Sequence, residues 1–143
     1  PLALARILVT KVALKAGDVV LDPCFGKGAF TNASPDNVFS MALMADEDFL
    51  RYNAEVDWII TNPPYSDLDR WLEHSFGLAN CGVALLLGLL NITPRRLELA
   101  NKHGFGLSQI HLCKVFHWFG ISAFCIWEKG KKDIITYDRV VWR

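Results

Sequence analysis

The feature that most constrains the fold is an apolar run at residues 83–90, in which Gly88 is the only interruption. A strand covered on both faces reads as a continuous apolar run, as in the parallel sheets of α/β proteins. The run is too short for a helix that crosses a bilayer. A hydrophobic fraction of 52% fits the same interpretation, because a doubly covered sheet needs many apolar residues. The run therefore predicts the central strand of a buried sheet.

Hydrophobic periodicity and turn residues predict an alternating order of elements along the chain. Helices are expected over residues 2–14, over 67–80 with Asp67 as N-cap, and after Thr93, with Thr93 as N-cap and Pro94 in the first turn. Further strands are expected at residues 18–22, 38–44, 56–61, 108–115, 121–127 and 134–141. This order predicts an α/β, Rossmann-like fold: a mostly parallel sheet with an antiparallel C-terminal strand pair and minimal helices. Its 143 residues predict a single catalytic domain over residues 1–143.

Charge is balanced overall, with 15 Lys and Arg against 15 Asp and Glu, but it is unevenly distributed. Acidic residues dominate residues 36–73, and basic residues dominate residues 94–132. Such asymmetry fits either a polyanion along one side or an ordinary solvated surface. The four cysteines have no metal-site spacing and neither do the histidines, so no metal is expected. Scattered cysteines among apolar neighbours favour a reduced, cytoplasmic compartment.

A glycine-containing loop at residues 22–30 follows the first expected strand. Gly26 and Gly28 remove side chains where the backbone has to turn tightly and approach a ligand. Asp22, at the strand end, can accept hydrogen bonds from an ammonium group or from amides of the loop. The loop has neither the P-loop spacing nor the full G-x-G-x-x-G fingerprint. By itself it is explained equally well by a structural turn.

The segment Asn62-Pro63-Pro64-Tyr65 after the third expected strand is more specific. Two prolines stiffen the loop and remove two backbone donors, so it presents mainly acceptors. Acceptors that hold both N–H bonds of an exocyclic amine free its lone pair for attack on an electrophile. An aromatic ring such as Tyr65 can stack on a base that has left the duplex.

These two segments resemble motifs of the class I S-adenosylmethionine-dependent methyltransferases, specifically the N6-adenine DNA methyltransferases. Residues 22–30 are similar to their D-P-x-x-G-x-G-x-F motif, and residues 62–65 to their N-P-P-Y motif. The resemblance implies methyl transfer from S-adenosyl-L-methionine to the N6 amine of a flipped-out adenine in DNA. It implies cofactor binding by Asp22, Pro23, Cys24, Gly26, Gly28, Phe30, Asp48 and Phe49, and catalysis by Asn62, Pro63, Pro64 and Tyr65.

The chain departs from that family in two respects. Residues 41–44 lack the acid expected at the end of the second strand, so Asp46 or Glu47 would have to replace it. There is also no room for a separate target-recognition domain. Selectivity would then come from residues 31–37, from a homodimer or from a separate specificity partner.

Three alternatives remain open at this stage. The same chemistry could act on RNA adenine or on a protein glutamine amide, and an inactive cofactor- or nucleic-acid-binding subunit is the third possibility. The expected location is the cytoplasm of a prokaryotic cell or virus-infected host, or the nucleoid. No membrane association is expected.

Overall fold

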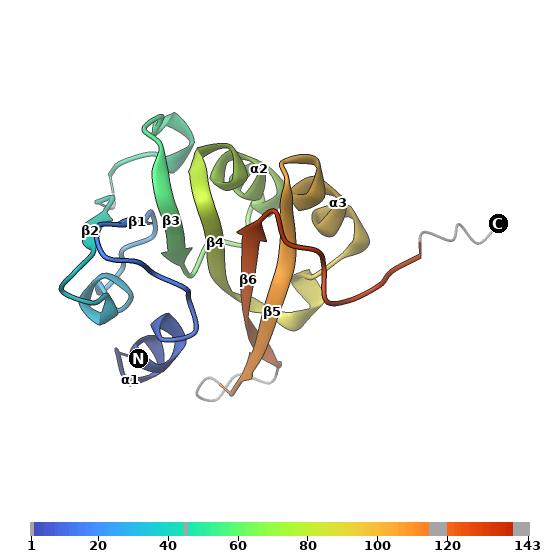
Figure 1. Cartoon of the computed structure of the whole chain (residues 1–143), viewed down its shortest axis with the longest axis horizontal. Coiled ribbons are helices and arrows are strands. Elements are labelled where there is room, and N and C mark those ends of the chain that lie inside the picture. The colour runs from blue at the N-terminus through green and yellow to red at the C-terminus, as the bar shows by residue number, and fades with distance from the viewer. Residues whose placement is uncertain (1, 45, 115–119, 139–143) are drawn as a thin grey trace.

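A computed structural model describes residues 2–44, 46–114 and 120–138, which form a six-stranded sheet in the order β2-β1-β3-β4-β6-β5 (Figure 1). The strands are β1 (Val19–Asp22), β2 (Phe39–Ala42), β3 (Val56–Thr61), β4 (Ala79–Gly88), β5 (Phe105–Cys113) and β6 (Ser122–Lys129). The helices are α1 (Leu2–Val9), α2 (Leu68–Leu78) and α3 (Pro94–Lys102), and three short 3₁₀ turns are η1 (Thr31–Ala33), η2 (Phe49–Arg51) and η3 (Leu89–Asn91).

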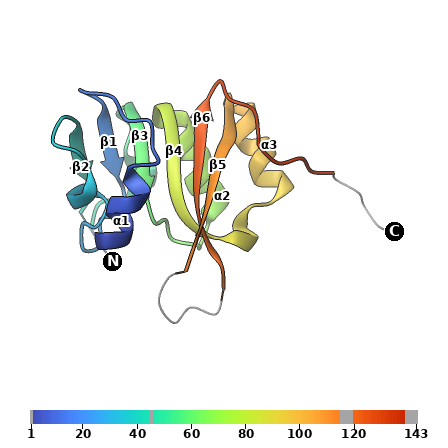
Figure 2. The same ribbon diagram turned by 60° about the horizontal axis from the view of Figure 1, so that its bottom comes forward.

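The sheet is mixed in the way the sequence predicts. β2, β1, β3 and β4 run parallel, and β6 is antiparallel to both β4 and β5. Helices α2 and α3 cover one face, and α1 covers part of the other (Figure 2). The predicted Rossmann-like α/β fold is confirmed.

The apolar run forms the centre of the sheet, although its bounds differ from the prediction. Val83, Ala84 and Leu85 are fully buried between two covered faces. Strand β4 begins earlier, at Ala79, because its pairing with β3 extends to Val56. It ends at Gly88, and Leu90 turns out of the sheet with 93% of its surface exposed.

Two helix predictions need correction. The first helix stops at Val9 instead of residue 14, since the amides of Lys11 and Val12 bond back three residues and close a turn. Asp67 does occupy the N-cap position of α2, but it has a left-handed backbone (φ 57°) and makes no side-chain cap bond. Its carboxylate instead accepts from Arg70 at 3.1 Å. Thr93 caps α3 through its side chain, as predicted, with Pro94 in the first turn.

The predicted strand at residues 134–141 is wrong for its described part, residues 134–138; residues 139–141 lie outside the described residues. The chain at Asp133 and Ile134 instead lies beside β5. The amide of Leu107 donates to the Asp133 carboxylate at 2.7 Å, and the amide of Ile134 donates to the Leu107 carbonyl at 2.9 Å. Gly106 permits this approach, because a Cβ there would collide with the Lys131 carbonyl.

Strand ends also shift elsewhere. Strand β2 stops at Ala42, two residues short of the predicted end, and β5 begins at Phe105, three residues before the predicted start. The early start of β5 follows from its pairing with Lys129 at the end of β6.

Candidate active site

Asp22 and Thr61 lie at the carboxyl ends of two neighbouring parallel strands, β1 and β3. Both residues are buried, with 3% and 0% of their surfaces exposed. The Thr61 hydroxyl donates to Asp22 Oδ1 at 2.5 Å, and the Cys24 amide donates to the same oxygen at 3.1 Å. Ligands of open α/β sheets bind at this edge, outside the carboxyl ends of the strands.

Burial raises the pKa of Asp22, while the hydrogen bonds from Thr61 and Cys24 partly lower it. A buried carboxylate in this position gains from a cationic group placed beside it, because the cation offsets the cost of desolvation. Burial also raises the pKa of the Cys24 thiol to about 11, so this cysteine is a neutral thiol at physiological pH.

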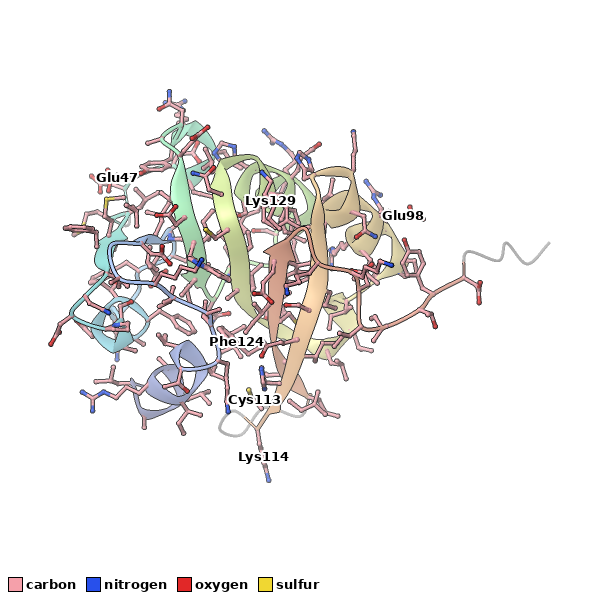
Figure 3. The ribbon with its side chains drawn as sticks, in the orientation of Figure 1. Glu47, Glu98, Cys113, Lys114, Phe124 and Lys129 are labelled. Carbon is pink, nitrogen blue, oxygen red and sulfur yellow. The ribbon has the colours of Figure 1, made fainter. Side chains whose placement is uncertain are left out.

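The glycine loop turns as its sequence predicts. Gly26 and Gly28 both have left-handed backbones, with φ of 52° and 69°. The Gly28 amide bonds to the Phe25 carbonyl at 2.6 Å, and a Cβ at Gly28 would lie 2.6 Å from the Phe25 ring. Any side chain at position 28 would therefore strain the backbone and displace Phe25. Phe30 closes the loop by stacking on Phe124 of β6, with ring centroids 6.1 Å apart; Figure 3 labels Phe124.

One cavity of about 230 Å³ joins the two predicted motifs. Its lining includes five of the predicted site residues: Asp22, Cys24, Gly26, Phe30 and Asn62. The other lining residues come from the glycine loop (Phe25, Lys27, Ala29), from α1 (Leu4, Ala5, Leu8) and from β4 (Leu86). The cavity thus combines a buried carboxylate, a loop cation, an apolar wall and an amide.

A larger hollow of about 390 Å³ lies beside α2, lined by Arg70, His74 and neighbouring residues. It is open to solvent and reaches Gly77 and Leu78, next to the amino end of β4. Its His74 ring already bonds to the Tyr52 carbonyl at 2.7 Å. We place the site at the smaller cavity, because the carboxyl ends of the strands and both motifs meet there.

The Asn-Pro-Pro-Tyr segment leaves β3 directly into this region. Asn62 lines the cavity and is also exposed to solvent. Pro63 is buried, whereas Pro64 and Tyr65 are exposed, with 51% of the Tyr65 surface accessible. The loop therefore presents the Asn62 amide to the cavity and, three residues further on, an exposed aromatic ring to solvent.

The predicted pair Asp48 and Phe49 is not brought to this cavity. Phe49 is 5% exposed and packs between the rings of Trp71 and His74, with centroids 4.7 and 4.9 Å away. The Asp48 carboxylate accepts from the Leu50 amide at 3.0 Å and so caps η2.

Thr61, Lys27 and the α1 wall are site residues that sequence reasoning missed. A polar residue directly after the apolar residues 58–60 and next to Asn62 was the available signal for Thr61. The stripe of Leu4, Ala5 and Leu8 was visible only as an ordinary amphipathic helix, because nothing local showed what it covers.

In the described part of the chain, no three His, Cys, Asp or Glu side chains converge as a metal site would require. No described helix has the length and apolar character needed to span a membrane.

No family model and no curated protein matches the chain. Solved structures do match its fold. Magnesium protoporphyrin IX methyltransferase from Synechocystis with bound SAM has a TM-score of 0.68 at 12% identity, covering 89% of this chain and 76% of that one. The E. cuniculi Mtq2–Trm112 complex, responsible for methylation of the translation termination factor eRF1, has a TM-score of 0.67 at 15% identity, covering 90% and 94%.

A methyltransferase from Pyrococcus furiosus has a TM-score of 0.61 at 20% identity, covering 91% of this chain and 83% of that one. The chain has the class I methyltransferase fold. These neighbours carry names that point to different substrates, a porphyrin and a protein factor among them. A shared fold does not select a substrate, which has to be argued from the site.

Proposed function

We propose that the protein is an S-adenosylmethionine-dependent methyltransferase that acts on the exocyclic N6 amine of adenine in DNA. The observation that carries the proposal is the convergence of Asp22 and Asn62 on one cavity, each at the end of its own strand. One motif would hold the cofactor and the other would hold the target nitrogen, and both reach the same space.

The cavity fits the charged methionine part of the cofactor. Its ammonium group would offset the buried Asp22 carboxylate, and its carboxylate would lie towards Lys27 of the glycine loop. Gly26 and Gly28 permit a close backbone approach, while the apolar wall excludes water. The cofactor, when bound, supplies an electrophilic methyl group on a sulfonium. A protein with this fold holds SAM in its solved structure, which supports the assignment.

Asn62 would accept one N–H bond of the target amine through its side-chain oxygen, and a backbone carbonyl of the loop would accept the other. Both prolines keep these acceptors rigid, so the geometry need not reorganise during the reaction. The exposed Tyr65 ring would stack on the flipped base. Phe49 would support the Asn-Pro-Pro-Tyr loop indirectly, because it packs on Trp71 of the helix that follows that loop. Asp48 would contribute by capping η2, which holds Phe49 in place.

A protein glutamine amide is the second candidate. The same acceptors can hold an amide nitrogen, and the Mtq2–Trm112 neighbour acts on a protein factor. RNA adenine and an inactive binding subunit remain as further outcomes of the test.

The test uses the whole chain with methyl-labelled S-adenosylmethionine and four substrates: duplex DNA, single-stranded DNA, RNA and glutamine-containing peptides. We expect label in N6-methyladenine of DNA, and loss of at least 100-fold of that label with Asn62→Ala. Cofactor affinity of Asn62→Ala, measured by calorimetry, should stay within about twofold of wild type. Asn80→Ala, another exposed asparagine, is the matched control and should keep full activity.

Each other result has a distinct meaning. Label confined to RNA or to peptides would replace the DNA assignment with that substrate. Cofactor binding without transfer to any of the four would favour the binding subunit. Absence of cofactor binding would overturn the methyltransferase proposal itself.

A further inference from the structure

The two edges of the sheet differ in what covers them. The outer edge of β5 is partly covered by the chain around Asp133 and Ile134, which bonds to both the amide and the carbonyl of Leu107. Strand β2, at the other edge, pairs within the described residues on one side only, with β1. Figures 1 and 2 both show β2 at the margin with no element beyond it. An uncovered edge is a template for pairing with another chain.

The backbone of β2 shows which groups face outward. The amides of Phe39 and Leu43 donate inward, to Asp18 and Asp22 carbonyls, at 2.8 and 3.2 Å. Because alternate residues of a strand bond to opposite sides, Ser40 and Ala42 direct their amides and carbonyls away from β1. These groups are available to one added strand.

The side chains of this edge are apolar and unusually exposed. Phe39 and Met41 are 68% and 38% exposed, and Met44 just beyond the strand is 60% exposed. Phe39 and Met41 pair in register with Val19 and Leu21, and Leu21 belongs to the core beneath α2. Their side chains therefore extend that face of the sheet beyond the area that α2 covers.

Acidic residues lie beyond both ends of β2, and one of them, Asp48, pairs with Arg51 at 3.7 Å. Residues 28–50 contain Asp36, Asp46, Glu47 and Asp48 and no Lys or Arg. Figure 3 shows Glu47 near this edge, far across the molecule from Glu98 of α3. Two copies paired antiparallel through β2 would bring Asp36 of one against Asp46 and Glu47 of the other, which like-charge repulsion disfavours. The same charges repel a nucleic acid.

We propose that β2 is a docking strand for a different protein, which adds an extended segment with apolar residues at its centre and basic residues at both ends. Its apolar side chains would cover Phe39 and Met41, and its basic side chains would meet the acids at both ends of β2. Backbone bonds to Ser40 and Ala42 would supply affinity. The inference uses residues outside the cavity, so it stands or falls independently of the proposed methyl transfer.

The test begins with a displayed library of random 12-residue peptides, selected on the immobilised whole chain. Enriched peptides are then synthesised, and their affinities are measured by fluorescence anisotropy. We expect enriched peptides to have an apolar centre flanked by Lys or Arg. Binding should weaken at least tenfold with Phe39→Lys/Met41→Lys, which is about 1.4 kcal/mol. Ile134→Lys, which replaces another exposed apolar residue (57%), should leave binding unchanged.

Hydrogen exchange of the bound chain locates the peptide. The amides of Ser40 and Ala42 should slow at least tenfold, while those of Phe39 and Leu43, already bonded, should change little. Melting curves confirm that both variants fold. The proposal is overturned if no peptide is enriched, if enriched peptides bind Phe39→Lys/Met41→Lys equally well, or if they protect other amides. Sedimentation that shows a dimer dispersed by Phe39→Lys/Met41→Lys would assign the edge to a second copy and overturn it as well.

Discussion

Thr61 donates its hydroxyl hydrogen to Asp22 at 2.5 Å, which ties the carboxyl ends of β3 and β1 together inside the core. Both residues are buried, so their polar groups depend on hydrogen bonds within the protein and not on solvent. The bond orients the carboxylate through its Oδ1 atom, and the Oδ2 atom takes no part in it. Asn62 follows Thr61 directly, so the same strand end positions both halves of the candidate site.

Asp22→Asn should stabilise the fold and weaken cofactor binding. Asparagine retains an oxygen for Thr61 and Cys24 but has no charge to desolvate. We expect a higher melting temperature at pH 7 and at least a tenfold loss of S-adenosylmethionine affinity by calorimetry. A variant that is less stable than wild type at pH 7, with unchanged affinity, would contradict the role given to the charge.

The raised pKa of Asp22 predicts that the stabilising effect of Asp22→Asn depends on pH. Since burial raises the folded pKa of Asp22 above its ordinary value of 3.8, its protonated form stabilises the fold. That contribution is complete below pH 3.8 and is lost as the pH rises through the folded pKa. The difference in melting temperature between Asp22→Asn and wild type should therefore be smallest near pH 4 and grow towards neutrality.

Thr61→Val keeps the shape of the side chain and removes the donor. The Asp22 carboxylate then loses a bond that lowers its pKa, so the pKa should rise further. We expect a loss of about 1–3 kcal/mol in the free energy of unfolding, measured with urea at pH 7. The loss should be smaller in an Asp22→Asn background, where no charge is left unsupported. Equal losses in both backgrounds would argue against the pair acting together.

Lys27→Met should weaken binding of S-adenosylmethionine by about two- to fivefold, because the ammonium is exposed and partly screened. Decarboxylated S-adenosylmethionine, which lacks the group that Lys27 would contact, should bind both proteins equally. Lys15→Met, an exposed lysine outside the cavity, is the control and should bind both ligands as wild type does. If Lys27→Met weakened the binding of both ligands equally, Lys27 would not contact the carboxylate of the cofactor.

Tyr65→Phe and Tyr65→Ala separate stacking from hydrogen bonding. Tyr65 is half exposed and has no core role, so both variants should fold normally. If the ring stacks on a base, phenylalanine should retain most activity and alanine should lose about 10- to 100-fold, since stacking contributes about 1–3 kcal/mol. Single-turnover rates on an adenine-containing substrate give the comparison. Matched losses in both variants would indicate that the hydroxyl is required.

Gly82→Ala and Gly77→Ala test the packing of the sheet. A Cβ at position 82 would collide with the Trp58 ring and lie 2.6 Å from the Trp127 carbonyl, so we expect a loss of at least about 1–3 kcal/mol. A Cβ at position 77, in α2, meets nothing within 4 Å, and alanine there should stabilise by up to about 1 kcal/mol. The free energies of unfolding of the two variants, measured by chemical denaturation, should differ from that of wild type in opposite directions.

The sequence by itself determined the layer order and the two loops. The apolar residues 83–87 indicate a strand covered on both faces, and left-handed turns at Gly26 and Gly28 are favoured by the absence of a Cβ. Thr93 and Pro94 start α3 for equally local reasons. Each of these features depends on interactions within a few residues, so a short stretch of sequence is enough to predict it.

Only the tertiary structure decided which residues meet. The bond between Asp22 and Thr61 spans 39 positions, and the closure of the cavity by α1 depends on where that helix packs. Phe49 shows the opposite case: the family resemblance implied a cofactor contact, but burial between Trp71 and His74 gives it a place in the core. Residues 131–134 lie beside β5, where Gly106 leaves space for the Lys131 carbonyl and Ile134 bonds to Leu107. Such outcomes depend on packing between distant segments, and no local pattern encodes them.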